Sequence, residues 1–300
     1  MVARIQQLIT ISVMSMAVTW LAFWLQKNFL VSISGFIFIV LVYSLFLALQ
    51  FVLLSFVNHA DPAPSPSWID LARAWAAETL TAPQVFCWRQ PFRANAVPDQ
   101  LSQAPSAPVR RGVVLVHGFF CNRGLWTPWM LALEEAGHPF VAVNLEPVFG
   151  SVDEYAEIIE AAVIRLRAAT GMAPVLVGHS MGGLAIRAWL RANGSHSRVH
   201  HIITIGTPHS GTWLGRFGCS TNGRQMRKDS QWVRALATHE LTAGTAPFTC
   251  WYSNCDNIVF PTSTAMLAGA DNRLVQGVAH VRLAFHKPVI AGALAIIGAM

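Results

Sequence analysis

A serine flanked by glycines follows a short apolar run, and this arrangement is typical of a serine nucleophile. The strand-like run Pro174–Val177 leads into Gly178-His179-Ser180-Met181-Gly182-Gly183 and then into a helical pattern at Leu184–Ala192. The glycines let strand and helix crowd around a sharp turn that presents the Ser180 hydroxyl at the helix N-terminus. A serine at its free pKa is a weak nucleophile and needs an adjacent base. The pattern predicts acyl-transfer chemistry; the plainer alternative is a glycine-rich turn that only links two elements.

The base that serves Ser180 is expected late in the chain, because strand-turn-helix sites of this type supply serine, acid and histidine in that order. Of eleven histidines, only His280 and His286 lie beyond the candidate acids. His280 follows a loop-like Gly277-Val278-Ala279, whereas His286 precedes Lys287-Pro288 at the start of an apolar helix. We predict that His280 is the general base and His286 is structural. The alternative for His280 is a surface loop histidine.

Four acids lie between the serine and this histidine: Asp229, Glu240, Asp256 and Asp271. Asp256 follows the strand-like Phe248–Ser253, which places it at the carboxyl end of a strand. There it would orient the imidazole and stabilise the imidazolium that forms. Asp271, in the turn Gly269-Ala270-Asp271-Asn272, is the main rival, and Asp229 and Glu240 are interpreted as solvated charges on helix faces.

Acyl transfer also needs hydrogen-bond donors for the oxyanion that develops on the substrate. One donor is the amide after the nucleophile, here Met181. The strand Val113–Val116 ends in His117-Gly118-Phe119-Phe120, and we predict that the Phe119 amide is the second donor. The alternative is that His117-Gly118 is an ordinary turn at the end of a strand.

The elements that must position these residues alternate along the chain. Strands are expected at Val113–Val116, Phe140–Asn144, Pro174–Val177, His201–Ile205 and Phe248–Ser253. Helices are expected at Trp126–Ala136, Val152–Ala169 and Leu184–Ala192. This alternation predicts an α/β fold with a mostly parallel sheet covered by helices on both faces. Sites in such folds lie at the carboxyl ends of strands, where the candidate residues fall.

With these residues in hand, the chain resembles the α/β-hydrolase superfamily, and within it the bacterial lipase and esterase group. The matching segments, in that group's order, are His117-Gly118-Phe119, Gly178-His179-Ser180-Met181-Gly182-Gly183, Gly206-Thr207-Pro208-His209-Ser210-Gly211-Thr212, Asp256 and His280. The chain is also similar to membrane-anchored hydrolases of proteobacteria, in which Asn122-Arg123-Gly124 follows the oxyanion loop. The resemblance covers about 109–286. It implies an α/β-hydrolase fold and ester hydrolysis through an acyl-serine intermediate.

The sequence departs from this group in two places. Large lipases often bind calcium through an aspartate shortly after the histidine, but Val281-Arg282-Leu283 follows His280, so no calcium is predicted. Only His209–Pro247 is left for a lid. The apolar residues of that segment could line an acyl entrance or belong to a core helix: Trp213, Leu214, Phe217, Trp232 and Leu236.

Composition points to a membrane for the remaining residues. Hydrophobic residues make up 53% of the chain and charged residues 12%, against about 25% charged in ordinary soluble domains. Residues 1–60 hold no acid and only Arg4 and Lys27. Of two apolar stretches, 29–57 is amply long and 8–25 is just sufficient for the roughly 20 residues that cross a bilayer. We predict a transmembrane hairpin; a cleaved signal peptide and a single anchor with an interfacial segment are the alternatives.

The predicted organisation is a membrane anchor at 1–59, a Pro-rich tether and edge element at 60–108, and a catalytic domain at 109–300. Within the tether, Ser67 caps a short helix to about Thr81 and Gln84–Trp88 is strand-like, before a Pro-rich link from Pro91 to Pro108. We expect a bacterial inner membrane, with the side that holds the catalytic domain left open. The net charge of +6 is spread out, so no nucleic-acid partner is expected, and oligomeric state is not indicated.

The five cysteines, Cys87, Cys121, Cys219, Cys250 and Cys255, show no C-x-x-C pairing, and no metal or cofactor is predicted. Cys219 could pair with Cys250 or Cys255 if the body lies outside the cytoplasm. Cys121 lacks the glycine-flanked turn of a nucleophile.

The sequence therefore predicts a membrane-anchored serine ester hydrolase of lipase or esterase type that acts on lipid or hydrophobic esters. Two alternatives remain: an acyltransferase that uses the same residues, and a membrane-tethered binding module without catalysis.

Overall fold

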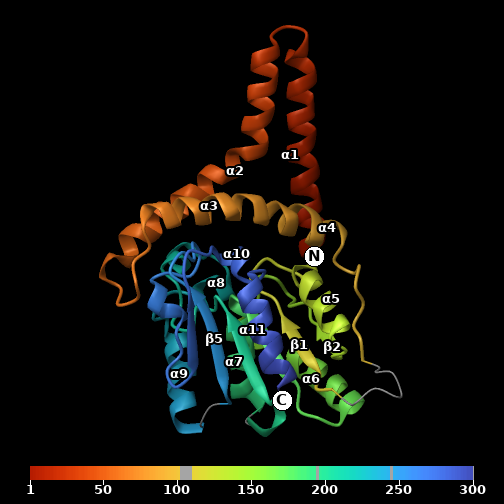
Figure 1. Cartoon of the computed structure of the whole chain (residues 1–300), viewed down its shortest axis with the longest axis vertical. Helices are drawn as coiled ribbons and strands as arrows, with labels where there is room; N and C mark the ends of the chain where they lie inside the picture. The colour runs from red at the N-terminus through yellow and green to blue at the C-terminus, as the bar shows by residue number, and fades with distance from the viewer. Residues whose placement is uncertain (102–109, 194–195, 244–245, 300) are drawn as a thin grey trace.

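The computed structural model describes residues 1–101, 110–193, 196–243 and 246–299. A parallel sheet of six strands, in the order β2-β1-β3-β4-β5-β6, forms the centre of the body (Figure 1). Its strands are β1 (Val113–Val116), β2 (Phe140–Ala142), β3 (Val175–His179), β4 (His201–Ile205), β5 (Phe248–Ser253) and β6 (Asp271–Val275). All five neighbouring pairs are parallel. The expected parallel sheet is therefore confirmed.

Helices cover both faces of this sheet, which explains why its central strands are continuous apolar runs. The covering helices are α5 (Thr127–Glu135), α6 (Ala156–Thr170), α7 (Met181–Asn193), α9 (Gln231–Ala243) and α11 (Lys287–Gly298). Side chains alternate along β1: Val114 and Val116 pack in one core with α6 and α7. Val113 and Leu115 pack in the opposite core with α5 and α11. Two hydrophobic cores therefore fix the sheet from its two sides.

The remaining short elements connect this framework. They are the 3-10 helices η1 (Asn58–Ala60), η3 (Arg123–Trp126), η4 (Val152–Tyr155), η5 (His196–Arg198), η6 (Trp213–Phe217) and η7 (Thr262–Ala265), with the short α-helices α8 (Thr221–Gln225) and α10 (His280–Leu283).

The edge of the sheet differs from the expectation at Asp271. This residue begins β6 instead of lying in a turn, and its exposed carboxylate pairs with Arg273 at 2.7 Å. The polar start Asp-Asn-Arg hides this strand in the sequence, because an edge strand keeps one side open to water. At the opposite edge, Gln100 forms an antiparallel bridge to Phe140 of β2, as an edge element would.

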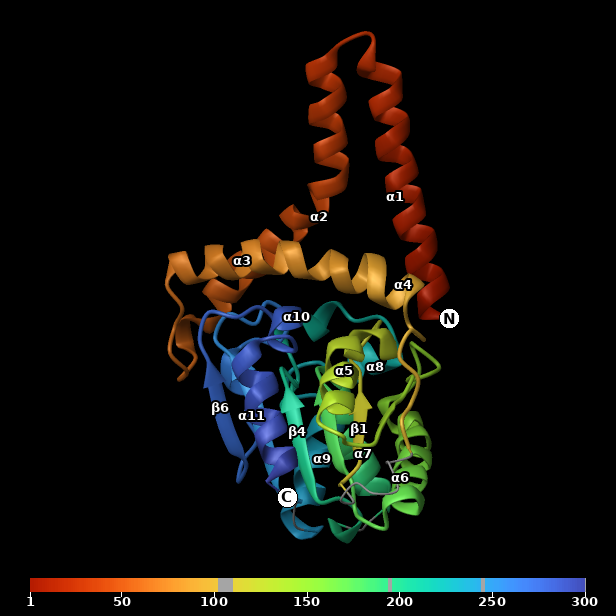
Figure 2. The same ribbon diagram turned by 45° about the vertical axis from the view of Figure 1, so that its right-hand side comes forward.

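Two long helices, α1 (Val2–Leu25) and α2 (Phe29–Val57), form a hairpin that projects from the body (Figures 1 and 2). Trp20 lies over Gly35, where an added Cβ would come within 1.9 Å of the indole nitrogen. Only glycine allows this close approach of the two helices. The expected helical hairpin is thus present.

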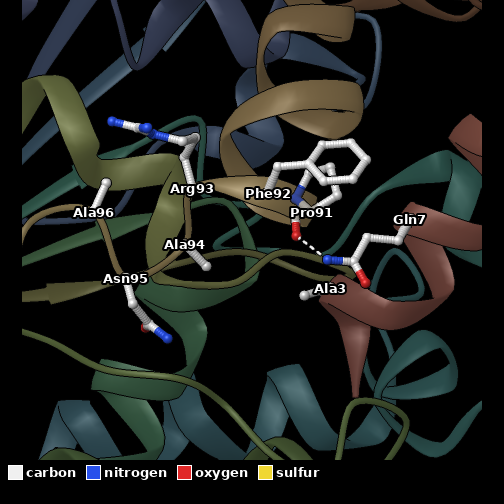
Figure 3. Close-up of a pocket in the computed structure, with 8 residues that line it drawn as sticks. All are labelled: Ala3, Gln7, Pro91, Phe92, Arg93, Ala94, Asn95 and Ala96. Carbon is white, nitrogen blue, oxygen red and sulfur yellow. Dashed lines mark hydrogen bonds between the residues drawn. The ribbon is translucent and has the colours of Figure 1, made fainter.

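The start of α1 is docked on the body beside the segment that follows α4 (Gln90–Phe92). Gln7 donates a hydrogen bond of 2.5 Å to the carbonyl oxygen of Pro91, across a hollow that Figure 3 shows. The preceding residue, Gln6, donates to the carbonyl oxygen of Phe120 at 3.1 Å. The amino end of the hairpin is therefore tied to the loop after β1.

Helix α3 (Trp68–Pro83) lies across the carboxyl ends of the strands (Figure 2). Ser67 and Asp70 form a reciprocal capping box at its start, as expected for a helix that begins at Ser67. Because the helix crosses this end of the sheet, it covers the region where the site is expected.

The strand predicted at Gln84–Trp88 is wrong. The helix that starts at Trp68 continues through a π-helical turn, η2 (Gln84–Arg89), into α4. A five-residue apolar run does not distinguish strand from helix, and here helical geometry buries Val85 in the core that holds Leu125 and Trp126. Most of the predicted Pro-rich link, 102–109, lies outside the described residues.

Within the described residues, three helical segments are long and apolar enough to cross a membrane: Val2–Leu25, Phe29–Ala60 and His280–Gly298. The third contains α11, which packs on the sheet through the buried residues Val289, Ala293 and Ile297. Packing on the sheet therefore separates α11 from α1 and α2, which project from the body for most of their length (Figure 1).

Candidate active site

Ser180 occupies a strained turn between β3 and α7. Its φ of 54° is in the left-handed region, which non-glycine residues rarely adopt. The turn is held by a hydrogen bond from the Ser180 amide to the carbonyl oxygen of Ile205, at 2.9 Å. Gly182 packs so closely that a Cβ there would come within 2.2 Å of the Val116 carbonyl oxygen. The glycines flanking Ser180 are therefore needed for the turn that points its hydroxyl out of the sheet.

Asp256 and His280 form a buried pair at the carboxyl end of β5. His280 Nδ1 lies 2.8 Å from Asp256 Oδ2. The other carboxylate oxygen, Oδ1, accepts the amides of Ile258 at 2.9 Å and Val259 at 2.7 Å. Each oxygen of the carboxylate thus has its own partners, so the carboxylate fixes the ring orientation of His280.

Two carboxylates determine the charge state of His280. Burial lowers its pKa, but Asp256 and Glu78 outweigh this effect, and the pKa of His280 is raised above its ordinary value. Its neighbour His179 behaves oppositely: burial and the nearby His280 hold the pKa of His179 well below the ordinary value. The two rings lie 4.7 Å apart, so one of them must stay neutral. A proton that enters this pair resides on His280.

Ser180, His280 and Phe119 line a common cavity of about 200 Å³. Ser180 and Phe119 also line a second, larger and mainly apolar cavity of about 800 Å³. Ser180 therefore lies where the two cavities meet, and His280 faces the smaller one.

The two residues predicted as oxyanion donors are both close to Ser180 along the chain or in space, and their role stays a prediction. Gly118 packs on the serine so tightly that a Cβ there would be 2.9 Å from the Ser180 Cβ, which brings the Phe119 segment alongside. Met181 is the first residue of α7, where an amide has no carbonyl partner within its own helix. In the loop after β1, Phe120 directly follows Phe119. It has a φ of 54°, and its carbonyl oxygen accepts a hydrogen bond from Gln6.

The rival acids lie elsewhere. Asp271 is the first residue of β6 and lies at the amino ends of the parallel strands, whereas Ser180 lies at their carboxyl ends. Asp229 is exposed, but in a turn with a φ of 55° and not on a helix face. The interpretation of Glu240 as a solvated charge is wrong: it binds Arg187 through two hydrogen bonds of 2.7 and 2.8 Å. The Arg187 side chain is only 1% exposed, so its charge requires a partner.

His286 caps the start of α11, away from the cavities around Ser180. Cys121 lines the smaller cavity, but burial raises its pKa to about 12, so it is a neutral thiol there. All five cysteines are free thiols: Cys219 is exposed, whereas Cys250 and Cys255 are buried. The conditional pairing of Cys219 with either of them is absent from the described structure.

The residues proposed for a lid divide between the two expected roles. Leu214 and Phe217 line the larger cavity. Trp213 stacks on Phe260, Trp232 packs against the core beside α7, and Leu236 is buried. The segment His209–Pro247 therefore contributes both to the larger cavity and to buried packing, and an acyl entrance at Leu214 and Phe217 stays a prediction.

Sequence reasoning missed three polar residues at this site. Glu78 of α3 is 1% exposed and accepts the amides of Val281 at 2.8 Å and Arg282 at 3.0 Å, directly after His280. Gln50 of α2 accepts from Asn257 at 2.6 Å, and Asn257 accepts the His280 amide at 3.2 Å. For Gln50 the available signal was a glutamine inside the strongly apolar α2, since polar residues in such helices are usually functional, whereas α3 is amphipathic and gave no such signal for Glu78.

Within the described residues, no group of three or more His, Cys, Asp and Glu side chains is arranged to hold a metal ion.

Comparisons with known proteins agree with the relationship expected from the motifs. A family model for the alpha/beta hydrolase fold matches residues 112–217. The mature lipase BlEst2 of Bacillus licheniformis is similar with a TM-score of 0.57 and 15% identity, over 65% of this chain and 95% of that one. Lipase B of Aspergillus fumigatus gives a TM-score of 0.55 at 20% identity, over 65% of this chain and 55% of that one. No curated protein matches the chain by sequence.

Proposed function

The chain has the α/β-hydrolase fold, and on this basis we propose that it is a membrane-anchored serine hydrolase of carboxylic esters. The observation that carries the proposal is the buried pair of His280 and Asp256, 2.8 Å apart, opening on the cavity that Ser180 also lines. A nucleophile, a base and an acid that orients the base are the parts that acyl transfer requires.

In the proposed reaction, Ser180 Oγ attacks the ester carbonyl carbon while His280 Nε2 takes the hydroxyl proton. The carbonyl oxygen becomes an oxyanion that the amides of Phe119 and Met181 stabilise, an effect worth about 3 kcal/mol for each donor. The tetrahedral intermediate then collapses, the carbon–oxygen bond to the alcohol breaks, and His280 returns the proton to the departing alcohol. Water repeats the sequence on the acyl-serine and releases the carboxylic acid.

Asp256 remains ionised throughout this proposed cycle. It holds the His280 tautomer that carries its proton on Nδ1 and leaves Nε2 free to accept from Ser180. It also stabilises the imidazolium that exists between the two proton transfers, which the raised pKa of His280 reflects.

The membrane anchor is proposed from the surface of the hairpin. Large apolar side chains along α1 and α2 are exposed, which is costly in water and favourable in lipid. At the tip of the hairpin, Lys27 lies over the ring of Phe23 and close to Trp24, a combination typical of a membrane–water interface. An anchor of this kind would hold Ser180 near lipid, so acyl lipids or other hydrophobic esters are the proposed substrates.

The test is hydrolysis of nitrophenyl esters of increasing chain length by the detergent-solubilised protein and its Ser180→Ala variant. We expect turnover by the wild type, loss of nearly all turnover in the variant, and labelling of the wild type alone by a fluorophosphonate probe. Labelling without hydrolysis, but with transfer to an added alcohol, would indicate an acyltransferase. A wild-type protein that is neither labelled nor active would contradict the proposal.

A further inference from the structure

The two cavities that meet at Ser180 differ in size and chemistry. The larger one, of about 800 Å³, is within the range of about 300–1,000 Å³ that ligand pockets occupy, and most of its wall is apolar. The wall of the smaller one, of about 200 Å³, is also mainly apolar, but it includes Glu78 and His280, which do not line the larger cavity. An ester bound across Ser180 would therefore place its acyl chain and its alcohol in different surroundings.

Helix α2 of the hairpin supplies one wall of the larger cavity. Its contribution consists of Phe46, Leu49, Gln50 and Leu53. These positions follow the i, i+3, i+4, i+7 spacing, so they form one face of the helix. The facing wall includes Leu214 and Phe217 from the segment after β4. A helix outside the region that matches the hydrolase family thus forms part of the cavity at the nucleophile.

The length of α2 places this wall at the membrane boundary. The helix has 29 residues, and about 20 residues already cross the hydrocarbon core. Counted from Phe29 at the hairpin tip, that distance ends near Leu49, so Phe46 and Leu49 lie at the level where lipid gives way to the body. The acyl chains of the bilayer end at the same level.

The rim of the larger cavity is exposed and apolar. The exposed fraction is 64% for Phe46 on α2 and 66% for Phe217 on the facing wall. Phe119 and Phe149 also line this cavity, with their tilted rings 5.9 Å apart between centroids. An exposed apolar rim next to a membrane helix is stable when lipid covers it, since water would disfavour it.

Buried polar contacts hold α2 in this position. Gln50 is linked through Asn257 to the His280 amide. Asn58, just after the helix, exchanges two hydrogen bonds with Thr262, at 2.8 and 3.1 Å. The wall is therefore fixed relative to the catalytic residues and is not a loosely tethered anchor.

We infer that α2 forms a wall of the acyl-binding site, and that the acyl chain of a bilayer lipid ester passes directly from the membrane along α2 into the larger cavity. The alcohol part lies in the smaller cavity, because His280 must protonate it as it leaves. This inference rests on the proposed ester hydrolysis at Ser180. It assigns the substrate as a lipid taken from the bilayer without release into water.

The first test narrows the acyl site with Leu49→Trp. We expect kcat/KM for long-chain nitrophenyl esters to fall about tenfold or more relative to kcat/KM for acetyl and butyryl esters. The matched control is Leu41→Trp on α2, two turns nearer the tip, at an exposed leucine that does not line the cavity. Retained short-chain activity shows that Leu49→Trp is folded.

The second test places a charge on the rim. Phe217→Glu should reduce hydrolysis of a long-chain ester embedded in phosphatidylcholine vesicles that contain the reconstituted protein. The readout is the ratio of this vesicle activity to hydrolysis of a soluble short-chain ester, which should fall relative to the wild-type ratio. The control, Leu80→Glu, adds the same charge to an exposed leucine of α3 that lines neither cavity, and should leave both activities unchanged.

The outcomes separate the inference from the function on which it rests. Active variants with the wild-type chain-length profile and wild-type vesicle activity would overturn the role of α2 and leave the esterase proposal intact. Equal losses in Phe217→Glu and Leu80→Glu would also overturn it, because they would indicate a general effect of surface charge. A wild-type protein that hydrolyses no ester would contradict both the role of α2 and the proposed ester hydrolysis.

Discussion

At Asp256 a single carboxylate has two separate tasks, since one oxygen meets His280 and the other holds the backbone of the loop after β5. An asparagine at this position keeps an acceptor for the loop amides but no longer stabilises the imidazolium.

We therefore predict that Asp256→Asn folds normally and lowers kcat by about 10³- to 10⁴-fold in a nitrophenyl ester assay. The rival acid is the control: Asp271→Asn should keep kcat within about twofold of the wild type. A large loss in Asp271→Asn, with normal activity in Asp256→Asn, would reverse the assignment.

Glu78 is buried beside His280 and adds to the charge that raises the pKa of this histidine. Burial raises the pKa of Glu78 itself, against the hydrogen bonds from Val281 and Arg282. His280 acts as a base only when neutral, so activity is lost as the pH falls through the pKa of His280.

Removal of the Glu78 charge should lower the pKa of His280 and shift the acidic limb of kcat/KM to lower pH. The measurement is the pH profile of Glu78→Gln against that of Glu134→Gln, which changes an exposed glutamate of α5. An unchanged limb in Glu78→Gln would show that Glu78 only holds the backbone after His280.

Among the elements, α7 and α9 are joined by the ion pair of Arg187 and Glu240. Arg187 also donates to the carbonyl oxygen of His209 at 2.7 Å, so it connects α7 to the segment after β4. The Arg187 side chain is 1% exposed and that of Glu240 is 14% exposed. A charge at this depth depends on its partner more than an exposed one does.

Glu240→Ala should therefore lower the stability of the detergent-solubilised protein by about 3 kcal/mol, because it leaves the Arg187 charge buried and unpaired. The readout is the thermal unfolding midpoint. Asp271→Ala removes an exposed pair with Arg273 and should change stability by about 0–1 kcal/mol. Equal effects would mean that water reaches Arg187.

For the whole molecule, several buried histidines are kept neutral by the fold. Burial lowers the pKa of His117 to about 4 and holds the pKa of His179 and His209 well below 6.5. His117 Nε2 accepts the Leu145 amide at 3.0 Å while Nδ1 lies 2.9 Å from the Gly118 carbonyl oxygen, so only the neutral ring satisfies both contacts.

Between pH 6.5 and about 4, His117 is protonated in the unfolded chain but neutral in the folded chain. Stability is therefore lost as the pH falls through this range, by roughly 3 kcal/mol for His117 alone. The raised pKa of His280 stabilises the folded chain only as the pH falls toward 6.5, so it does not offset this loss below pH 6.5.

We expect the thermal midpoint to fall steeply from pH 6.5 to 4.5. His117→Gln should be less stable at pH 7.5 but lose less on acidification, whereas the exposed His59→Gln should keep the wild-type slope. A wild-type midpoint that does not change with pH would contradict the prediction.

Patterns in the sequence were enough to predict the parallel sheet, the helical hairpin and the order of the candidate residues Ser180, Asp256 and His280. Apolar periodicity and glycine-flanked turns are local properties, so a reader of the sequence can recognise them. Tertiary structure alone decided that Glu78, Gln50 and Asn257 converge on His280, that Glu240 pairs with Arg187, and that Gln84–Trp88 is helical. Contacts across some 200 residues, such as Glu78 with Val281, depend on how α2 and α3 cross the sheet, and no local pattern encodes that packing.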